Sequence, residues 1–471
     1  MDERAYLGEL AKKPFLVRVP GYLKLAGPGY IQSALTLGGA STASCVVMGS
    51  LAGYKLLWVQ PLGIVLGVCV LAAVAKQTCH TGERAYQVFW ERLHPSLAIL
   101  WGVSALLASL IWHVPQYSLT ANGAITLAGS VGLDLDTVPT RLLIGAVILG
   151  CGCGAAYLYH VGARGLRAYE IGIQCLVWSI VLAFAVVGFA SGIRWKAFFL
   201  GITGVSFAKD VAAHAVDGRV VKPIVSGLAA AVGINMLFLY PYSLLKRNWG
   251  KEHKELAYFD LFAGMLVPFL IATTFLVIGT ANTLGPDPGE YGNEVQRVAD
   301  LIPALKPTFG DRLSTLLVGF GMMAVGFSTI TTMMLASGFI CCEMFGFEHR
   351  GKAGLWFSFL PGIAVFGVCF SNPWFVAITT STLCAPLMPM AVICFVALLN
   401  MKSYMGDETP RGGRRLIWNG VLGLAVAAMI VWSCFSLWSN WQDIKRRLEP
   451  RQESVATAYA WPVEEAAMET I

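Results

Sequence analysis

The chain has 471 residues, and its 34 Lys or Arg and 28 Asp or Glu residues make up only 13% of them. Soluble domains carry about 25% charged residues, whereas this chain is 56% hydrophobic with a mean hydropathy of +0.64. This composition excludes a soluble globular enzyme, a disordered chain and a nucleic-acid-binding module. The net charge of +6 needs no nucleic acid partner, because membrane proteins carry Lys and Arg in their cytoplasmic loops.

Apolar runs long enough to cross a bilayer, which takes about 20 residues in a helix, recur along the whole chain. Alternating ten-residue segments typical of a membrane β-barrel do not occur. The sequence therefore predicts an all-α integral membrane protein with about 11 transmembrane helices. The predicted spans are 25–52, 56–77, 95–128, 140–160, 166–192, 224–245, 258–281, 313–343, 354–372, 374–399 and 415–438.

The segments between and around these runs define the predicted organisation. Residues 1–24 form a cytoplasmic N-terminal segment, and the first apolar run reads as an uncleaved helix. Two five-helix sets, 25–192 and 224–399, are joined by a connecting loop at 193–223. Helix 11 at 415–438 leads into a polar tail at 439–471. Lys and Arg are more frequent in the loops on the side of the N-terminus, so we expect the N-terminus to be cytoplasmic and the C-terminus to lie outside. We expect the membrane to be a bacterial-type inner or plasma membrane.

Two of the spans contain a break, and the breaks lie at matching places. In the first span, Leu37-Gly38-Gly39-Ala40-Ser41-Thr42 combines paired glycines with residues that cap a new helix. In the sixth, Gly233-Ile234-Asn235 precedes a run with Pro241, which is expected to kink the helix. The first and sixth spans each open one five-helix set. This pattern predicts an inverted-repeat transporter with its site at the midplane.

Several short motifs, in the same order along the chain, resemble the Nramp family of divalent-metal transporters. The match begins in the first span and continues to the tenth. The resemblance implies a LeuT-like fold, a 5+5 inverted repeat with broken helices 1 and 6, and secondary transport. The motifs are Gly27-Pro28-Gly29, Gly53-Tyr54-Lys55-Leu56-Leu57-Trp58, Thr81-Gly82-Glu83 (TGR in the family), Ser328-Thr329-Ile330-Thr331 (STIT) and Asn400-Met401-Lys402-Ser403-Tyr404-Met405-Gly406.

The metal-binding residues of the family are not preserved. Its helix-one DPGN motif, whose Asp and Asn bind metal, falls on Gly38, Gly39, Ala40 and Ser41. Its helix-six Met falls on Asn235, its Ala on Val232 and its following His on Leu237, in an alignment that allows a slip of one residue. The family's acidic residues of the helix-three proton pathway fall on His113 and Gln116.

The predicted substrate site therefore offers hydroxyl, amide and carbonyl groups but no carboxylate and no metal ligand set. Divalent ions usually take carboxylates among their ligands, whereas half-helix N-termini at a midplane attract anions. We therefore expect a small anion or zwitterion as cargo, such as bicarbonate, a small carboxylate or an amino acid. The alternatives are a Mg or Mn transporter with an atypical site and a non-transporting sensor. The predicted site residues are Gly38, Gly39, Ala40, Ser41, Thr42, Val232 and Asn235.

Coupling residues are expected in the third and eighth spans. His113 and Gln116 are proton candidates, because histidine titrates near neutral pH, and the hydroxyls of Ser328, Thr329, Thr331 and Thr332 are candidates for a sodium site.

The remaining expectations follow from residues and motifs elsewhere in the chain. Glu170 and Asp260 match acidic positions of the family near helix starts, which predicts an interfacial N-terminal role. No cofactor is expected beyond sodium or a proton as coupling ion. The absence of a nucleophile–base constellation predicts that the protein is not an enzyme. Its expected partners are the small substrate and the lipid bilayer.

Overall fold

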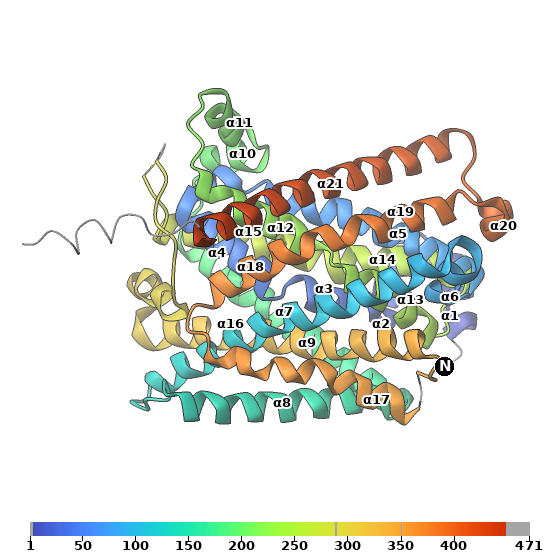
Figure 1. The fold of residues 1–471 in the computed structure, drawn as a ribbon, viewed down its shortest axis with the longest axis horizontal. Helices are drawn as coiled ribbons and strands as arrows, with labels where there is room; N and C mark the ends of the chain where they lie inside the picture. Colours follow the sequence, from blue (N-terminus) through green and yellow to red (C-terminus); the bar gives the residue numbers. More distant parts are fainter. Residues whose placement is uncertain (1–2, 288–289, 350, 449–471) are drawn as a thin grey trace, which may run out of the picture.

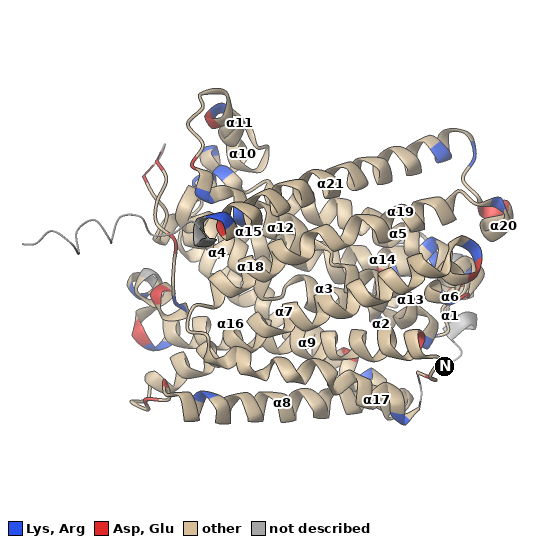
Figure 2. Cartoon of the chain, viewed as in Figure 1, with Lys and Arg blue, Asp and Glu red and all other residues tan. Residues whose placement is uncertain are grey.

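The structure is a computed structural model that describes residues 3–287, 290–349 and 351–448. Helices make up nearly all of this part of the chain, and no strand occurs within it. Ten of its helices are long and apolar enough to cross a membrane, or eleven if one bent pair is a single span. The prediction of an all-α membrane protein with about 11 spans is confirmed. The long helices lie alongside one another (Figure 1), and Lys, Arg, Asp and Glu gather toward the two ends of the bundle (Figure 2).

The N-terminal segment and the first five spans follow one another in chain order. Short helices α1 and α2 precede the first span, which is divided into α3 and α4. The elements are α1 (Glu3–Ala11), α2 (Phe15–Leu25), α3 (Pro28–Thr36), α4 (Gly39–Ala52), η1 (Gly53–Leu56), α5 (Val59–Thr81), α6 (Ala85–Val88), η2 (Phe89–Leu93), α7 (Pro95–Gly129), α8 (Val138–His160) and α9 (Ala163–Ala190).

The connection to the second set contains two short helices. The sixth span follows it and is also divided, into α12 and α13. These elements are α10 (Trp195–Ile202), α11 (Val205–Ala212), η3 (Gly218–Val220), α12 (Val221–Ala231), α13 (Ile234–Lys246), η4 (Lys251–His253), α14 (Lys254–Leu261), η5 (Phe262–Leu266) and α15 (Val267–Thr283).

The last four spans complete the bundle. About half of the predicted ninth span is a 3-10 helix, η7. The eleventh span extends past its predicted end at 438 to Leu448, because a helix can continue once it has left the apolar layer. The rest of the predicted tail lies outside the described residues. The elements are η6 (Val298–Leu301), α16 (Ile302–Phe345), α17 (Lys352–Phe359), η7 (Leu360–Cys369), α18 (Pro373–Cys384), η8 (Ala385–Leu387), α19 (Met388–Leu399), α20 (Lys402–Met405), η9 (Gly406–Glu408) and α21 (Gly412–Leu448).

Both predicted breaks are present. α3 and α4 are bent by 47°, and Gly38 between them has extended backbone angles. In the sixth span, Val232 and Gly233 are extended and separate α12 from α13. Pro241 lies inside the continuous helix α13, so the break depends on the extended pair and not on the proline.

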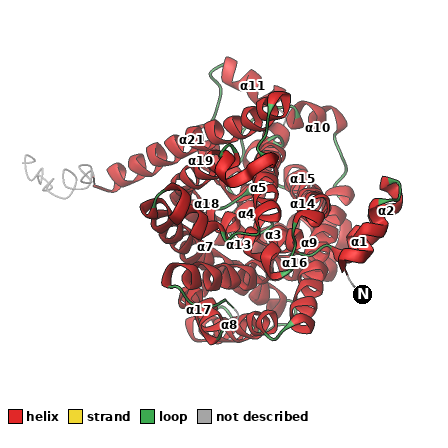
Figure 3. Ribbon diagram, turned by 90° about the vertical axis from the view of Figure 1, so that its right-hand side faces the viewer, coloured by secondary structure: helices red, strands yellow, loops and turns green. Residues whose placement is uncertain are grey.

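The broken helices occupy the centre of the bundle when it is viewed from its end (Figure 3). Every residue of α3 and α4 is buried, and so are those from Ile234 to Leu244 of α13. The peripheral spans differ: only 28% of the most apolar stretch of α8 is buried, against 94% for the sixth span. The broken helices are thus shielded from lipid. Unpaired backbone groups are tolerated at such a place, because it is buried within the protein.

Candidate functional site

The two breaks meet at a small cavity of about 20 Å³, close to the minimum that holds one water molecule. Its walls come from both broken spans, from α7 and from α16. The lining residues are Leu35, Gly38, Ala40, Ser41, Trp112, Gln116, Ala230, Gly233, Asn235, Met236 and Met333.

The N-termini of α4 and α13 both point at this cavity, because each half-helix begins at the break of its span. The first N–H groups of a helix lack intrahelical partners. Here Gln116 Oε1 accepts a hydrogen bond from Gly39 N at 2.9 Å, and its Nε2 donates to Trp112 O at 3.2 Å. At α13, the sulfur of Met236 accepts from Gly233 N at 3.2 Å and from the Thr36 hydroxyl at 3.8 Å. A neutral amide and a thioether therefore cap the two half-helices.

Three further polar atoms at the cavity have no hydrogen-bond partner among the described residues: Ser41 Oγ, Asn235 Nδ2 and Trp112 Nε1. All three side chains are buried. Buried polar groups are nearly always satisfied, by protein, water or ligand, and burying one without a partner is costly. The cavity thus presents polar atoms that a bound cargo or water would satisfy.

The predicted substrate residues divide into two groups. Gly38, Ala40, Ser41 and Asn235 line the cavity, and Gly39 touches it through Gln116. The remaining two lie apart from it. The Thr42 hydroxyl is directed at Leu37 O, 3.4 Å away.

Val232 is directed at α5. A Cβ added at Gly67 would overlap Val232 Cγ2, so Val232 packs against the second span and does not line the cavity.

The third span presents two faces. Trp112 and Gln116, four residues apart, line the cavity. His113 lies on the adjoining face, with its ring 5.4 Å from that of Tyr117. It is fully buried, and neither ring nitrogen has a hydrogen-bond partner in the described part of the chain.

In the eighth span, one predicted hydroxyl reaches the first span. Thr329 Oγ1 lies 2.8 Å from Ala34 O in α3 and 3.0 Å from Val325 O. Ser328, Thr331 and Thr332 are hydrogen-bonded to carbonyls of their own helix at 2.9–3.1 Å. Thr329 therefore ties α16 to the broken helix.

Sequence reasoning missed several cavity residues: Leu35, Trp112, Ala230, Gly233, Met236 and Met333. Met236 lies one residue after Asn235, so the slip of one residue allowed in the alignment would have found it. Trp112 precedes Gln116 by four residues and shares its helix face, but the sequence alone does not show which face of this apolar helix lines the cavity.

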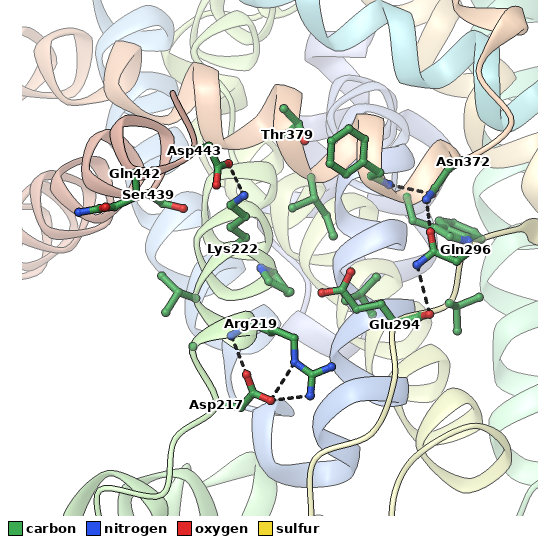
Figure 4. A pocket seen from close by; sticks show the side chains of 18 of the residues that line it. Asp217, Arg219, Lys222, Glu294, Gln296, Asn372, Thr379, Ser439, Gln442 and Asp443 are labelled. Atoms are coloured by element: carbon green, nitrogen blue, oxygen red, sulfur yellow. Dashed lines mark hydrogen bonds and ion pairs between the residues drawn. The ribbon is translucent and has the colours of Figure 1, made fainter. Parts of the chain in front are cut away.

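A larger pocket of about 670 Å³ opens at the end of the bundle opposite the N-terminus. It lies between the starts of α12 and α18, the segment 294–296 and the end of α21. Polar contacts along its walls (Figure 4) include Lys222 with Asp443, Asp217 with Arg219, and Asn372 Nδ2 donating to Gln296 Oε1 at 2.6 Å.

This outer pocket and the cavity lie along the same two helices. On α4, Val47 lines the pocket and Ser41 the cavity, and on α12 the corresponding residues are Lys222 and Ala230. Between them, Ser44 Oγ donates to Ser226 Oγ at 2.9 Å, and both side chains are fully buried. This contact joins α4 to α12 between the cavity and the outer pocket.

Comparison with known proteins identifies what this architecture resembles. Residues 29–439 match the family model described as natural resistance-associated macrophage protein-like. The divalent metal cation transporter MntH of Bacillus subtilis (strain 168) is 23% identical over 423 residues, covering 87% of this chain and 91% of that protein.

Solved structures agree on the fold. A manganese transporter from Eremococcus coleocola, in complex with an aromatic bis-isothiourea substituted compound, is 16% identical with a TM-score of 0.65, over 88% of this chain and 85% of that one. Mhp1, a nucleobase-cation-symport-1 family transporter, is 14% identical with a TM-score of 0.55, over 88% and 92%. The LeuT-like fold is confirmed, and the relatives favour the divalent-metal alternative over the anion expected from the sequence.

Proposed function

Because this chain belongs to the Nramp family, and is a secondary-active transporter of the membrane, we propose that its cargo is a divalent metal ion bound in the midplane cavity. The observation that carries the proposal is the family match over residues 29–439, together with a relative named a divalent metal cation transporter that is covered over 91% of its length. The chemistry of the cavity then decides how such an ion can be held.

The cavity offers neutral donor atoms of two kinds. Oxygens come from the side chains of Ser41, Gln116 and Asn235, and sulfur from Met236 and Met333. Amide, carbonyl and water oxygens suit Mg, Ca and Mn, whereas thioethers favour transition metals. A mixed set favours a first-row ion such as Mn²⁺ over Mg²⁺.

The absence of a carboxylate sets a further condition on binding. Among the described residues, no group of three or more His, Cys, Asp or Glu side chains could hold a metal ion. Neutral ligands compensate poorly for lost hydration, so the ion must keep part of its water. A cavity of about 20 Å³ has too little room for such an ion, and the broken helices must separate for it to enter.

A small anion or zwitterion is the second candidate, and a specific observation favours it. The unpaired donors of Ser41, Asn235 and Trp112 surround a site at which two helix N-termini converge. Each terminus carries roughly half a positive charge. Bicarbonate, a small carboxylate or an amino acid would satisfy these donors directly.

Uptake into proteoliposomes distinguishes the two candidates. We expect Mn²⁺ uptake that bicarbonate and small carboxylates do not replace. In Met236→Leu, which removes the sulfur and keeps the volume, uptake should fall at least tenfold in kcat/KM. The matched control is Met48→Leu, because Met48 is also fully buried but does not line the cavity.

Two results would refute the metal proposal. One is bicarbonate or carboxylate uptake that Mn²⁺ does not inhibit and that is lost in Ser41→Ala or Asn235→Ala. The other is equal Mn²⁺ uptake in Met236→Leu and Met48→Leu.

Protons are the coupling ion that we propose. The unpaired ring nitrogens of His113, next to cavity-lining Trp112, support this choice because histidine exchanges protons readily. Uptake should follow an imposed pH gradient and lose that dependence in His113→Gln. A response to a sodium gradient alone would instead favour the hydroxyl group of α16.

A further inference from the structure

Helices α10 and α11 form a hairpin that lies beside the bundle and not across its end (Figures 1 and 3). Four residues separate the end of α9 at Ala190 from the start of α10 at Trp195. A chain of that length reaches at most about 17 Å, so α10 begins near the level at which the fifth span leaves the apolar layer. The hairpin therefore lies where lipid headgroups meet the protein.

The hairpin is held against η1 by close packing and by an ion pair. Lys55 Nζ donates to Asp210 Oδ2 at 2.8 Å, and the Tyr291 hydroxyl donates to the same oxygen at 2.8 Å. A Cβ added at Gly201 would overlap the backbone carbonyl of Tyr54, so α10 packs directly on η1. The hairpin thus has a fixed place beside the bundle, and the surfaces next to it are already formed.

A pocket of about 570 Å³ lies between the hairpin, η1 and the segment that follows α15. The hairpin contributes basic side chains to it, and the segment after α15 contributes acidic ones. In addition to the paired Lys55 and Asp210, the charged residues that line the pocket are Arg194, Lys196, Lys209, Asp287 and Glu290.

Four of these charges have no partner in the protein. Within the described part of the chain, the side chains of Lys196 and Lys209 form no hydrogen bond or ion pair. The same holds for the carboxylates of Asp287 and Glu290 among the described residues. The pocket thus offers unpaired cations on one side and unpaired anions on the other.

The face of α10 that points away from the bundle is aromatic. Trp195 and Phe199, one turn apart, are 60% and 59% exposed, and their rings are nearly parallel with centroids 6.2 Å apart. Lys196, which lines the pocket, follows Trp195 directly. Aromatic side chains are enriched at the boundary between headgroups and acyl chains. A lipid whose headgroup occupies the pocket can therefore place its acyl chains beside this aromatic face.

We propose that the pocket binds the headgroup of a phosphatidylethanolamine molecule. Lys196 and Lys209 bind the phosphate, because ammonium groups form strong, charge-assisted hydrogen bonds to phosphate oxygens. Asp287 and Glu290 bind the ammonium of the ethanolamine. The site lies outside the cargo cavity, so it goes beyond the function proposed above and does not depend on the identity of the ion.

The charges of the pocket distinguish this headgroup from the two commonest alternatives. Phosphatidylglycerol supplies the phosphate but no cation, so the carboxylates of Asp287 and Glu290 remain unpaired and repel it. Phosphatidylcholine supplies both charges, but its quaternary nitrogen has no N–H group to donate to a carboxylate. Phosphatidylethanolamine alone among these three lipids matches both sides of the pocket with hydrogen bonds.

Native mass spectrometry of the purified full-length protein, titrated with the three lipids carrying identical acyl chains, tests the site. We expect wild type to bind phosphatidylethanolamine at least fivefold more tightly than either of the others. The double variant Lys196→Gln/Lys209→Gln should lose at least fivefold in this affinity. The matched control is Lys352→Gln/Lys402→Gln, which removes two exposed lysines at the end of the bundle near the N-terminus and should bind as wild type does.

Two further variants separate headgroup recognition from a general attraction of lysine for phosphate. Asp287→Asn/Glu290→Gln should weaken binding of phosphatidylethanolamine and strengthen that of phosphatidylglycerol, so that the preference disappears. Phe199→Ser should weaken binding of the lipid but leave unchanged the binding of glycerophosphoethanolamine, the soluble headgroup without acyl chains.

Several results would overturn the proposal. Equal binding of the three lipids by wild type is one, and wild-type affinity for phosphatidylethanolamine in the double lysine variant is another. If phosphatidylglycerol binds best, the acidic side of the pocket does not select the headgroup. If glycerophosphoethanolamine binds as tightly as the lipid, the occupant is a soluble molecule and the lipid site is wrong.

Discussion

Gln116→Glu is the substitution that best reports the sign of the cargo's charge. Glutamate has nearly the shape of glutamine and keeps the oxygen that accepts the Gly39 N–H at 2.9 Å. It loses the donor that binds Trp112 O at 3.2 Å. The substitution thus places one negative charge at the wall of the cavity with little change in packing.

The structure allows the magnitude to be worked out. Loss of the hydrogen bond to Trp112 costs about 0.5–1.5 kcal/mol, while a carboxylate at the N-terminus of α4 gains up to about 2 kcal/mol in a partly buried site. Gln116 is buried, and desolvating an unpaired carboxylate costs several kcal/mol more, so the cargo-free variant should be less stable than wild type and should regain stability when a cation binds. For the cargo, a unit charge about 4 Å away contributes roughly 4 kcal/mol at an effective dielectric constant of about 20, and a divalent ion about twice that.

Desolvation consumes part of this gain, so we expect Mn²⁺ to bind at least about tenfold more tightly, which corresponds to roughly 1.4 kcal/mol. Titration calorimetry on purified protein measures the affinity, and proteoliposome uptake shows whether the tightly held ion is still released. Gln77→Glu is the matched control, because Gln77 is a buried glutamine that does not line the cavity. Weaker Mn²⁺ binding in Gln116→Glu, or equal gains in both variants, would refute the reasoning.

Two further predictions concern stability. Gly67→Ala should lower the thermal unfolding midpoint in detergent, because its Cβ would overlap Val232 at the break of the sixth span and overpacking costs about 1–3 kcal/mol. The control is Gly129→Ala, whose Cβ meets no atom within 4 Å and which should leave the midpoint unchanged. Equal midpoints of the two variants would contradict the assigned packing. A hydrogen bond from Lys76 lowers the pKa of Glu408, so this contact stabilises the fold above the usual glutamate pKa and loses its effect as the pH falls through the lowered value. Glu408→Gln should therefore lower the midpoint slightly at pH 7 and not at all in strong acid, whereas a difference that persists in acid would contradict the assignment.

The spans and their breaks were accessible from sequence because each depends on local chemistry. About 20 consecutive apolar residues leave few alternatives to a membrane helix, and the glycines at 38–39 and 233 mark where the helices separate. The bounds of the short helices in the connection at 193–223 were harder to set, since α10 and α11 have eight residues each and helices of that length depend on tertiary packing. The end of α21 was set too early for a similar reason: polarity marks where a helix leaves the bilayer, not where it stops.

The site was less accessible, because it depends on register across a break. An apolar helix has no polar face to fix its rotation, so the spacing alone could not decide whether His113 or Trp112 faced the cavity. In the sixth span, a shift of one residue separates Asn235 from Met236, and the extended backbone at Val232 and Gly233 interrupts helical periodicity where it was needed. Val232 was assigned to the cavity because an Ala of the family falls on it in the alignment, although it packs on α5.

The buried carboxylates of this transporter lie away from the cargo cavity, whereas a high-affinity binding protein would place them at the ligand. Its scarce buried carboxylates include Asp260, which binds backbone N–H groups, and Glu170, which binds arginine, so neither has the interfacial role expected from the sequence. None of them lines the cavity, where neutral oxygens and sulfurs stand instead. A carboxylate at the cargo would strengthen binding and slow release, whereas a carboxylate at a helix N-terminus stabilises one closed conformation until that helix moves. Since transport requires the cargo to leave as readily as it enters, we expect a cavity lined by neutral donors to bind its cargo weakly enough to release it.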